Sequence, residues 1–244
     1  MPGGVARTAT SSCKTLGGET VTITGSNFGG GGATVLLNMS PCANVTHWPG
    51  SPHGNLSCVT PAGTGKNVWF EVRGSGASDS VTAALLSYEV PTVEGFGGCG
   101  GGGGQTGESG QTGGGESTPH VGCPRDGKKS DEDGGGRLRV TVTGRNFGPL
   151  QAGVVVGGVI ADKAPPPEGF DGDFQATTFA YLPGGSGLKQ KVAVLQVNGE
   201  IGEGVGLVNY ERCQPGTRNV YDGEKMYYTC EGCGPGTYSK DYER

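Results

Sequence analysis

One stretch of the chain occurs twice, and this repeat constrains the fold more than any other feature. Residues 20–29 (Thr-Val-Thr-Ile-Thr-Gly-Ser-Asn-Phe-Gly) are followed 119 positions later by residues 139–148 (Arg-Val-Thr-Val-Thr-Gly-Arg-Asn-Phe-Gly). In both copies β-branched apolar residues alternate with Thr, so the apolar side chains lie on one face of an extended segment. Each copy is therefore predicted to form a β-strand with one buried face.

A glycine and then Asn-Phe-Gly follow the alternating residues in each copy. We expect Gly25 and Gly144 to end the two strands. Phe28 and Phe147 are then free to fold back as apolar anchors, and the glycine after each Phe permits a positive φ. The motif predicts a strand, a turn and a buried aromatic ring in each copy.

The two copies continue through the same series of features. Each is followed by an apolar strand, a Pro-x-Gly-x-Gly turn (61–65 and 183–187) and a closing strand that ends in a tyrosine (Tyr88 and Tyr210), with turn and tyrosine both at an offset of 122. This series resembles IPT/TIG domains, the immunoglobulin-like folds of plexins, Rel-type transcription factors and many large cell-surface proteins. The resemblance implies an all-β chain with two immunoglobulin-like sandwiches in tandem.

Composition agrees with two small domains rather than one large one. The chain has 244 residues, of which 52 are glycine and only 33% are hydrophobic, too few for a single dense core. We place the first IPT/TIG domain at residues 1–90 and the second at 91–212. Residues 97–118 of the second are rich in glycine and polar residues, and we predict a disordered insertion there.

Charge and cysteine content restrict the partner and the compartment. The net charge is −5, and the basic run from Arg125 to Lys129 is followed at once by acidic residues, so no nucleic acid partner is expected. Eight cysteines in a loop-rich, β-patterned chain favour an oxidising compartment. No apolar run approaches the roughly 18 residues of a membrane span, so no transmembrane segment is expected.

The first residues lack the features of an export signal. Residues 1–7 contain no apolar core of the length that a secretory signal needs. We interpret the chain as an internal piece of a longer protein, or as a gene model with a wrong start. Any membrane anchor, such as a single span, would then belong to the parent protein.

Alignment of the two copies pairs some of the cysteines and leaves others alone. It places Cys13 against Cys123, and Cys123 has Cys99 upstream, whereas the equivalent partner of Cys13 would lie before residue 1. Residues 97–118 are either a flexible linker or, if Cys99 bonds Cys123, a closed surface loop of the second domain. We favour the loop because Pro91 begins the repeat before the glycines do. The two sandwiches would then sit end to end as a short rod.

The first copy contains a further cysteine pair and three glycosylation sequons. A bridge from Cys42 to Cys58 would close a loop of about 17 residues and contribute about 3 kcal/mol in the chain-entropy model. The sequons begin at Asn38, Asn44 and Asn55. In a secreted protein we expect N-glycans mainly on Asn44 and Asn55, because Pro follows the Asn38 sequon. The alternative is that these are ordinary turn residues.

After residue 212 the repeat ends and a different pattern begins. Residues 213–244 contain Cys213-Gln-Pro-Gly-Thr and Cys230-Glu-Gly-Cys-Gly-Pro-Gly-Thr-Tyr-Ser. This pattern resembles the cysteine-rich repeats of ephrin-receptor-like and tumour-necrosis-factor-receptor-like proteins. The resemblance implies a small disulfide-rich module with a Cys213–Cys230 bridge and with Cys233 paired beyond the end of this chain. A zinc site would need a second pair of ligands, and none follows.

Catalytic signals are weak throughout the chain. The three histidines, His47, His53 and His120, lie in Pro- and Gly-rich segments and are expected to be exposed turn residues rather than general bases. No Gly-x-Ser-x-Gly elbow is present. Residues 63–66 lack the leading Gly and the Ser or Thr of a phosphate loop and are expected to form a turn. We predict neither an enzyme nor a cofactor.

Acidic and aromatic residues are the remaining candidates for ligand contacts. Residues 131–133 and 171–173 lack the spacing of a calcium loop, so solvated acidic turns are expected and no metal site is predicted. Trp69 lies on an apolar strand and is expected to cap an edge of the core. Trp48, in a loop among the sequons, is the more exposed candidate for a sugar or protein contact.

Together these features predict a non-catalytic module of an extracellular or cell-surface protein that serves in binding, adhesion or spacing. Its ligand would be a protein or a glycan on the cell surface or matrix, bound by loops at the sandwich ends and by exposed edges. One alternative is an accessory module of a secreted carbohydrate-active enzyme. Another is an intracellular Rel-type DNA-binding protein, which the acidic charge and the cysteines disfavour.

Overall fold

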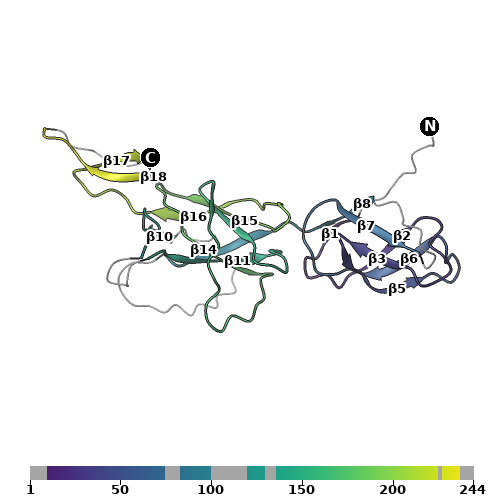
Figure 1. Cartoon of the computed structure of the whole chain (residues 1–244). Helices are drawn as coiled ribbons and strands as arrows, with labels where there is room; N and C mark the ends of the chain where they lie inside the picture. The colour runs from purple at the N-terminus through teal and green to yellow at the C-terminus, as the bar shows by residue number, and fades with distance from the viewer. Residues whose placement is uncertain (1–9, 75–82, 100–119, 130–135, 225–226, 237–244) are drawn as a thin grey trace, which may run out of the picture.

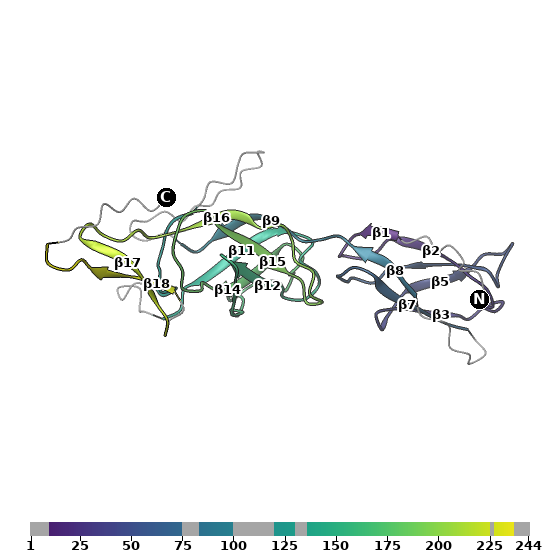
Figure 2. The ribbon, with the colours of Figure 1, turned by 90° about the horizontal axis from the view of Figure 1, so that it is seen from above.

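The computed structural model describes residues 10–74, 83–99, 120–129, 136–224 and 227–236, and all regular structure in them is β (Figure 1). The strands form two sandwiches and a separate hairpin. Figures 1 and 2 show the two sandwiches end to end, with the hairpin beyond the second. The predicted all-β, immunoglobulin-like fold class is therefore confirmed. Residues 1–9 and 100–119 lie outside the described part of the chain.

The first sandwich consists of a five-stranded and a three-stranded sheet. The larger sheet has the order β1 (Thr10–Cys13), β8 (Ala83–Tyr88), β7 (Val68–Arg73), β3 (Thr34–Leu37), β4 (Ser40–Pro41). The smaller has the order β2 (Thr20–Thr24), β6 (Asn55–Val59), β5 (Ala43–His47). Their facing side chains form one core that includes Val35, Leu37, Leu56 and Leu86.

The second sandwich repeats this plan with one change in the smaller sheet. Its larger sheet has the order β10 (His120–Cys123), β16 (Val205–Tyr210), β15 (Gln190–Leu195), β12 (Gly153–Val156), β13 (Val159–Ala161). Its smaller sheet has the order β14 (Thr177–Tyr181), β11 (Arg139–Arg145), β9 (Thr92–Gly97). Thus, among the described strands, β11, the counterpart of β2, has a neighbour on both sides, whereas β2 has β6 alone.

The repeated motif forms the strands β2 and β11 and buries both phenylalanines. Phe28 and Phe147 belong to the two hydrophobic cores, and the glycine after each has a positive φ of 84° or 103°. A Cβ atom on Gly25 or Gly144 would collide with the Phe ring, which explains these glycines. One expectation was wrong: β11 does not end at Gly144 but continues to Arg145, because it also pairs with β9 there.

The closing tyrosines are held against the Pro-x-Gly-x-Gly turns. The hydroxyl of Tyr88 donates to the carbonyl of Pro61 (2.9 Å), and that of Tyr210 donates to the carbonyl of Pro183 (2.8 Å). Each ring lies where the Cβ of the glycine two residues after that Pro would be. Burial, with a smaller effect of Cys13, raises the pKa of Tyr88 to about 12, and burial raises the pKa of Tyr210 as well.

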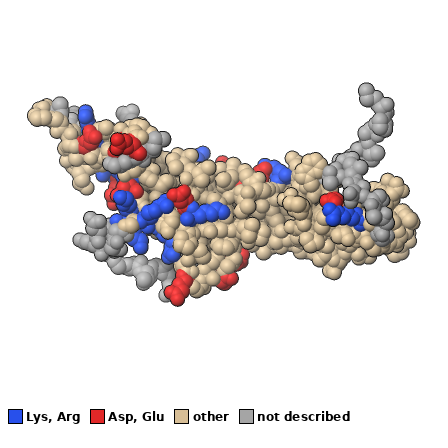
Figure 3. Space-filling view, in the orientation of Figure 1, with Lys and Arg blue, Asp and Glu red and all other residues tan. Residues whose placement is uncertain are grey.

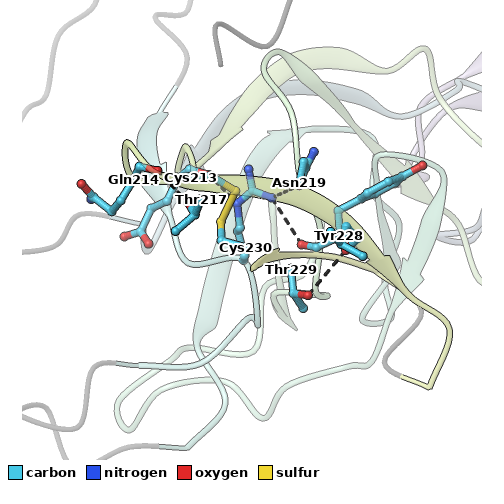
Figure 4. Close-up of a disulfide and its surroundings, with 10 residues drawn as sticks. Cys213, Gln214, Thr217, Asn219, Tyr228, Thr229 and Cys230 are labelled. Carbon is cyan, nitrogen blue, oxygen red and sulfur yellow. Dashed lines mark hydrogen bonds between the residues drawn. A yellow bond between two sulfur atoms is a disulfide. The ribbon is translucent and has the colours of Figure 1, made fainter. Parts of the chain in front are cut away.

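Three disulfides join Cys42 to Cys58, Cys99 to Cys123, and Cys213 to Cys230. The first two lie in the cores of the first and second sandwich. The third fastens the hairpin of β17 (Thr217–Asp222) and β18 (Tyr227–Gly232). Among the described cysteines, Cys13 and Cys233 are free. Figure 4 shows the third disulfide beside the hairpin strands.

The start of the expected glycine-rich insertion needs a correction. Gly97 is the last residue of β9, and Cys99 is in a disulfide, so residues 97–99 belong to the folded sandwich. The rest of the expected insertion, residues 100–118, lies outside the described residues. Cys99 precedes these residues and Cys123 follows them, and the bridge between the two cysteines lies in the second sandwich.

Candidate binding site at the junction of the two sandwiches

The turn that contains Asp171 and Asp173 carries a contact between the sandwiches. The Asp171 carboxylate accepts from the Asp173 backbone N–H (3.0 Å), and the Asp173 carboxylate accepts from the backbone N–H of Gln175 (2.9 Å). The Gln175 side chain then meets Thr15 of the first sandwich, whose hydroxyl donates to Gln175 Oε1 (2.7 Å) and whose carbonyl accepts from Nε2 (3.2 Å). Both Asp residues are exposed, and their carboxylates shape this turn.

The short connection between the sandwiches is fixed by Gln196. This side chain is 1% exposed, and its Nε2 donates to the carbonyls of Glu89 (3.2 Å) and Asn146 (2.7 Å). Asn146 in turn donates from Nδ2 to the carbonyl of Val90 (3.4 Å). A buried amide that bonds both the connection and the Asn-Phe-Gly turn restrains the second sandwich relative to the first.

Loops from the two sandwiches also approach each other directly. Lys66 and Glu200 form an ion pair of 3.0 Å across the junction. Because the Lys66 side chain is 54% exposed, such a pair contributes at most about 1 kcal/mol. A Cβ atom on Gly65 would overlap the side chain of Asn198, so the absence of a side chain there permits this close approach.

A cavity of about 370 Å³ lies between these loops. Its apolar wall includes Leu150 and Val197, both more than half exposed, and its polar groups include Asn198 and Thr64. Residues from both sandwiches line it: Leu37, Asn38, Ser40, Pro61, Ala62, Gly63, Thr64, Val68, Tyr88, Pro149, Leu150, Val197 and Asn198. An open cavity with apolar walls and scattered polar groups suits a saccharide or a peptide side chain.

The three sequon asparagines occupy different surroundings. Asn38 is exposed in the β3–β4 turn and lines the junction cavity. Asn44 is exposed on β5, the outer strand of its sheet, and the hydroxyl of its sequon residue Thr46 donates to the Asn44 carbonyl (3.2 Å). Asn55 is partly buried at the start of β6. Asn38 and Asn44 are thus more open than Asn55.

A second contact joins the hairpin to the second sandwich through Arg125. This guanidinium is 9% exposed and donates from Nε to the carbonyl of Glu211 (2.7 Å). Its Nη1 donates to the side chain of Asn219 and to the carbonyl of Tyr228. Figure 4 shows Asn219 and Tyr228 on the paired strands of the hairpin. Arg125 begins the basic run that ends at Lys129, but in the fold its guanidinium is used in this contact.

The histidines are not all exposed turn residues. His47 ends β5 and is partly buried, with Nδ1 2.8 Å from the carbonyl of Pro52 and Nε2 accepting from the N–H of Ala33 (3.4 Å). Since a carbonyl can only accept, Nδ1 carries the proton, and both ring nitrogens are used. His53 is exposed, as expected. His120 begins β10 and is therefore in a strand, not a loop.

Both tryptophans are on the surface of the first sandwich. Trp69 is 55% exposed and Trp48 is 47% exposed. The expectation that Trp69 caps the core was wrong, because its strand neighbours Val68 and Phe70 point inward and Trp69 points outward. Either ring is available to a ligand.

Basic side chains gather on the second sandwich in a way that the sequence does not show. In the view of Figure 3 most Lys and Arg side chains lie there. Lys128 pairs with Arg137, while Arg139 and Lys163 pair with adjacent residues of β14. Acidic Asp162 is among them, in an ion pair of 2.6 Å with Arg137. The basic residues are thus clustered in space, beyond the run from Arg125 to Lys129.

The described residues contain neither a metal-binding cluster nor a membrane-spanning helix. In that part of the chain no three residues among His, Cys, Asp and Glu lie close enough to share a metal ion. Across the same ranges no helix is long and apolar enough to cross a membrane. The acidic residues 131–133 lie outside the described residues.

Comparisons with solved structures give distant likenesses. One is the surface glycan-binding protein PbSGBP-B from Prevotella bryantii, with a TM-score of 0.43 and 12% identity, over 84% of this chain and 39% of that one. Another is SGBP-B of the Bacteroides ovatus mixed-linkage glucan utilization locus, in complex with a mixed-linkage heptasaccharide, with a TM-score of 0.28 and 12% identity, over 89% and 49%. The chain spans less than half of each.

Sequence comparison identifies part of the chain. No curated protein sequence matches it significantly. The family model of the IPT/TIG domain matches residues 8–88, which include all strands of the first sandwich. The first sandwich is therefore an IPT/TIG domain.

Proposed function

We propose that the chain is a non-catalytic binding and spacer segment of an extracellular or cell-surface protein. In this proposal residues 91–212 are a second IPT/TIG domain and residues 213–244 are a cysteine-rich repeat. The shared strand order of the larger sheets and the matched tyrosine contacts support the second domain. The Cys213–Cys230 bridge supports the repeat.

The observation that carries the proposal is a disulfide in every structural unit. In the two sandwiches the bonded cysteines are between 0% and 7% exposed. Cysteines that are oxidised within a core belong to proteins that fold in an oxidising compartment. The same observation disfavours an intracellular Rel-type factor, and we propose no nucleic acid partner.

We place the ligand site at the junction cavity. The contacts of Gln175 and Gln196 hold its two halves in a fixed relation, and a preformed site loses less entropy on binding. The apolar surfaces of Leu150 and Val197 would pack against a sugar ring or a peptide side chain, while Asn198 and Asn38 would supply hydrogen bonds. A protein or a glycan is therefore the proposed ligand. An accessory role beside a carbohydrate-active enzyme would use the same surface.

Disulfide and glycan mapping tests the compartment. The chain is expressed through a secretory pathway, free thiols are blocked, and the digest is analysed by mass spectrometry. We expect the three bridged peptides, with Cys13 and Cys233 outside these bridges and glycans on Asn44 and Asn55. Eight reactive thiols together with unmodified sequons would overturn the extracellular assignment.

Binding to an oligosaccharide array and to a panel of cell-surface ectodomains tests the junction. We expect Leu150→Asp and Val197→Asp to reduce binding about tenfold or more, since each removes apolar contact area. The matched control is Ile160→Asp, because Ile160 is also more than half exposed but lies on β13, outside the cavity. An equal loss in all three variants, or in none, would place the ligand elsewhere.

A further inference from the structure

The outer edge of β2 is open in the described part of the first sandwich. β2 pairs with β6 on one side only, at the edge of its sheet. Its counterpart β11 pairs with β14 on the same side and also with β9 on the other. The offset of 119 aligns Thr22 with Thr141 and Thr24 with Thr143, and these two threonines of β11 pair with Gly97 and Gly95. At the equivalent positions on β2, the part of the chain that the structure describes supplies no such strand.

The core next to this edge is less well covered than its counterpart. Phe28 is 8% exposed and Val21 is 9% exposed, whereas Phe147 and Val140 are both 0% exposed. In the second sandwich β9 places Val93 and Phe96 into the core and packs across β15 and β16. A core that lacks a covering strand equivalent to β9 is expected to show this difference in exposure.

Cys13 lies where the second sandwich has a bonded cysteine. Cys13 is in register with Tyr88 in a parallel pair, and Cys123 is in register with Tyr210 in the equivalent pair. The carbonyl of Cys13 accepts from Glu89, as that of Cys123 accepts from Glu211. Cys123 is bonded to Cys99, two residues after β9 ends, whereas Cys13 is buried and free.

We propose that the edge of β2 accepts an added antiparallel strand that carries a cysteine and that this cysteine bonds Cys13. The second sandwich defines the strand: it has apolar residues at the positions of Val93 and Phe96 and a cysteine at the position of Cys99. Residues 1–9 contain no cysteine, so the strand comes from a segment other than those residues.

The covalent step is a thiol–disulfide exchange. The Cys13 thiolate attacks the strand's cysteine sulfur in a mixed disulfide with glutathione, the Cys13–strand bond forms, and glutathione thiolate leaves and takes up a proton. No net oxidation occurs. Burial, and to a smaller extent Glu19 and Glu89, raise the pKa of the Cys13 thiol, so exchange with small disulfides should be slow. Docking of the strand would bring the two sulfurs together and accelerate it.

The probe is the synthetic peptide Pro-Thr-Val-Glu-Gly-Phe-Gly-Gly-Cys, the sequence of residues 91–99, as its glutathione mixed disulfide. The protein is the full chain with Cys233→Ser, which leaves Cys13 as its free thiol among the described cysteines. We expect release of glutathione and an adduct that maps to Cys13. It should form about tenfold faster than with a peptide whose Val and Phe are replaced by Asp, because the apolar contacts are lost.

Hydrogen exchange supplies a readout that does not need the bond. The same peptide with Ser in place of Cys should slow exchange of the amides in residues 20–24 and leave β11 unchanged, since β11 is already paired on both sides. Equal adduct rates for the two peptides and for glutathione disulfide alone, or no protection of β2, would overturn the proposal. So would oxidation of the wild-type chain to Cys13–Cys13 or Cys13–Cys233 dimers in the presence of the peptide.

Discussion

The two sandwiches begin from the same ten-residue motif and complete their cores in different ways. In the second, β9 covers the edge of β11 and the Cys99–Cys123 bond fastens β9 to the larger sheet. In the first, the smaller sheet is extended by β5, which pairs with β6 on the side away from β2. The Cys42–Cys58 bond there joins β6 to the segment between β4 and β5. The position of Cys58 opposite Val21 is taken in the second sandwich by Ala180 opposite Val140.

This difference separates what the motif determines from what it leaves to its surroundings. The strand, the turn and the buried Phe are common to both sandwiches, so they follow from local sequence. Which side of the motif strand receives a neighbour depends on segments that lie far from it in the chain. An edge of a sheet can therefore be open in one sandwich and covered in the other while both motif strands keep the same alternating pattern.

The largest expected effect comes from removal of the Phe ring in each motif. Phe147→Ala should destabilise the second sandwich by about 3–5 kcal/mol, and Phe28→Ala should cost the first sandwich less, because its core is already open at one edge. Both tryptophans of the chain lie in the first sandwich, so urea unfolding followed by Trp fluorescence reports that sandwich alone. Hydrogen exchange reports the second. Equal losses would contradict the difference in core coverage.

Removal of a sandwich disulfide should act within one sandwich. Cys42→Ala with Cys58→Ala, and Cys99→Ala with Cys123→Ala, each open a loop whose closure contributes about 3 kcal/mol. The second pair should cost more, because β9 also loses its attachment to the larger sheet. The Trp fluorescence transition should shift only for the first pair. A shift with the second pair would show that the two sandwiches unfold together.

The tyrosine contacts should be equivalent in the two sandwiches. Tyr88→Phe and Tyr210→Phe each remove a hydroxyl and leave a proline carbonyl without its donor, at a cost of about 1–3 kcal/mol. Urea midpoints of the single variants, read by Trp fluorescence for the first and by hydrogen exchange for the second, measure both. A loss of stability in only one variant would mean that the two hydrogen bonds have the same geometry but contribute differently to stability.

The same tyrosines predict a loss of stability in alkali. The pKa of Tyr88 is raised from 10 to about 12, so the folded state keeps a proton that the unfolded state loses. The stabilising effect is complete below pH 10 and disappears as pH rises from 10 through 12. The urea midpoint of the wild-type protein should decline over this pH range, and the decline should be smaller in Tyr88→Phe. An unchanged slope in the variant would exclude Tyr88 as its source.

The smallest effect should come from the contact between the sandwiches. Gln196→Ala removes one hydrogen bond to the connection, at Glu89, and one to the Asn-Phe-Gly turn, at Asn146. The loss should cost about 1 kcal/mol and broaden the range of relative orientations without unfolding either core. Small-angle X-ray scattering would show a shorter average extension. Gln190→Ala is the control, because Gln190 bonds the carbonyl of Leu188 within the same sandwich. Identical scattering profiles for the wild type and Gln196→Ala would mean that other contacts hold the two sandwiches end to end.

Local patterns in the sequence predicted the strands, the buried Phe rings and the order of turn and tyrosine. They failed where a residue's environment depends on distant segments. Alternation on β7 did not reveal which face is inward, because Trp69 is as apolar as Val68 and Phe70. The Thr15 and Gln175 contact spans 160 positions, and neither residue stands out from its neighbours. The junction cavity depends on such contacts and therefore had no sequence signal.

A parallel strand pair in each sandwich bears on how the chain carries a pulling force. β1 lies parallel to β8, and β10 lies parallel to β16. Tension that enters at the start of β1 and leaves at the end of β8 slides the two strands past each other, and the hydrogen bonds between them share the load. They must then break together rather than one by one. A segment built in this way resists extension.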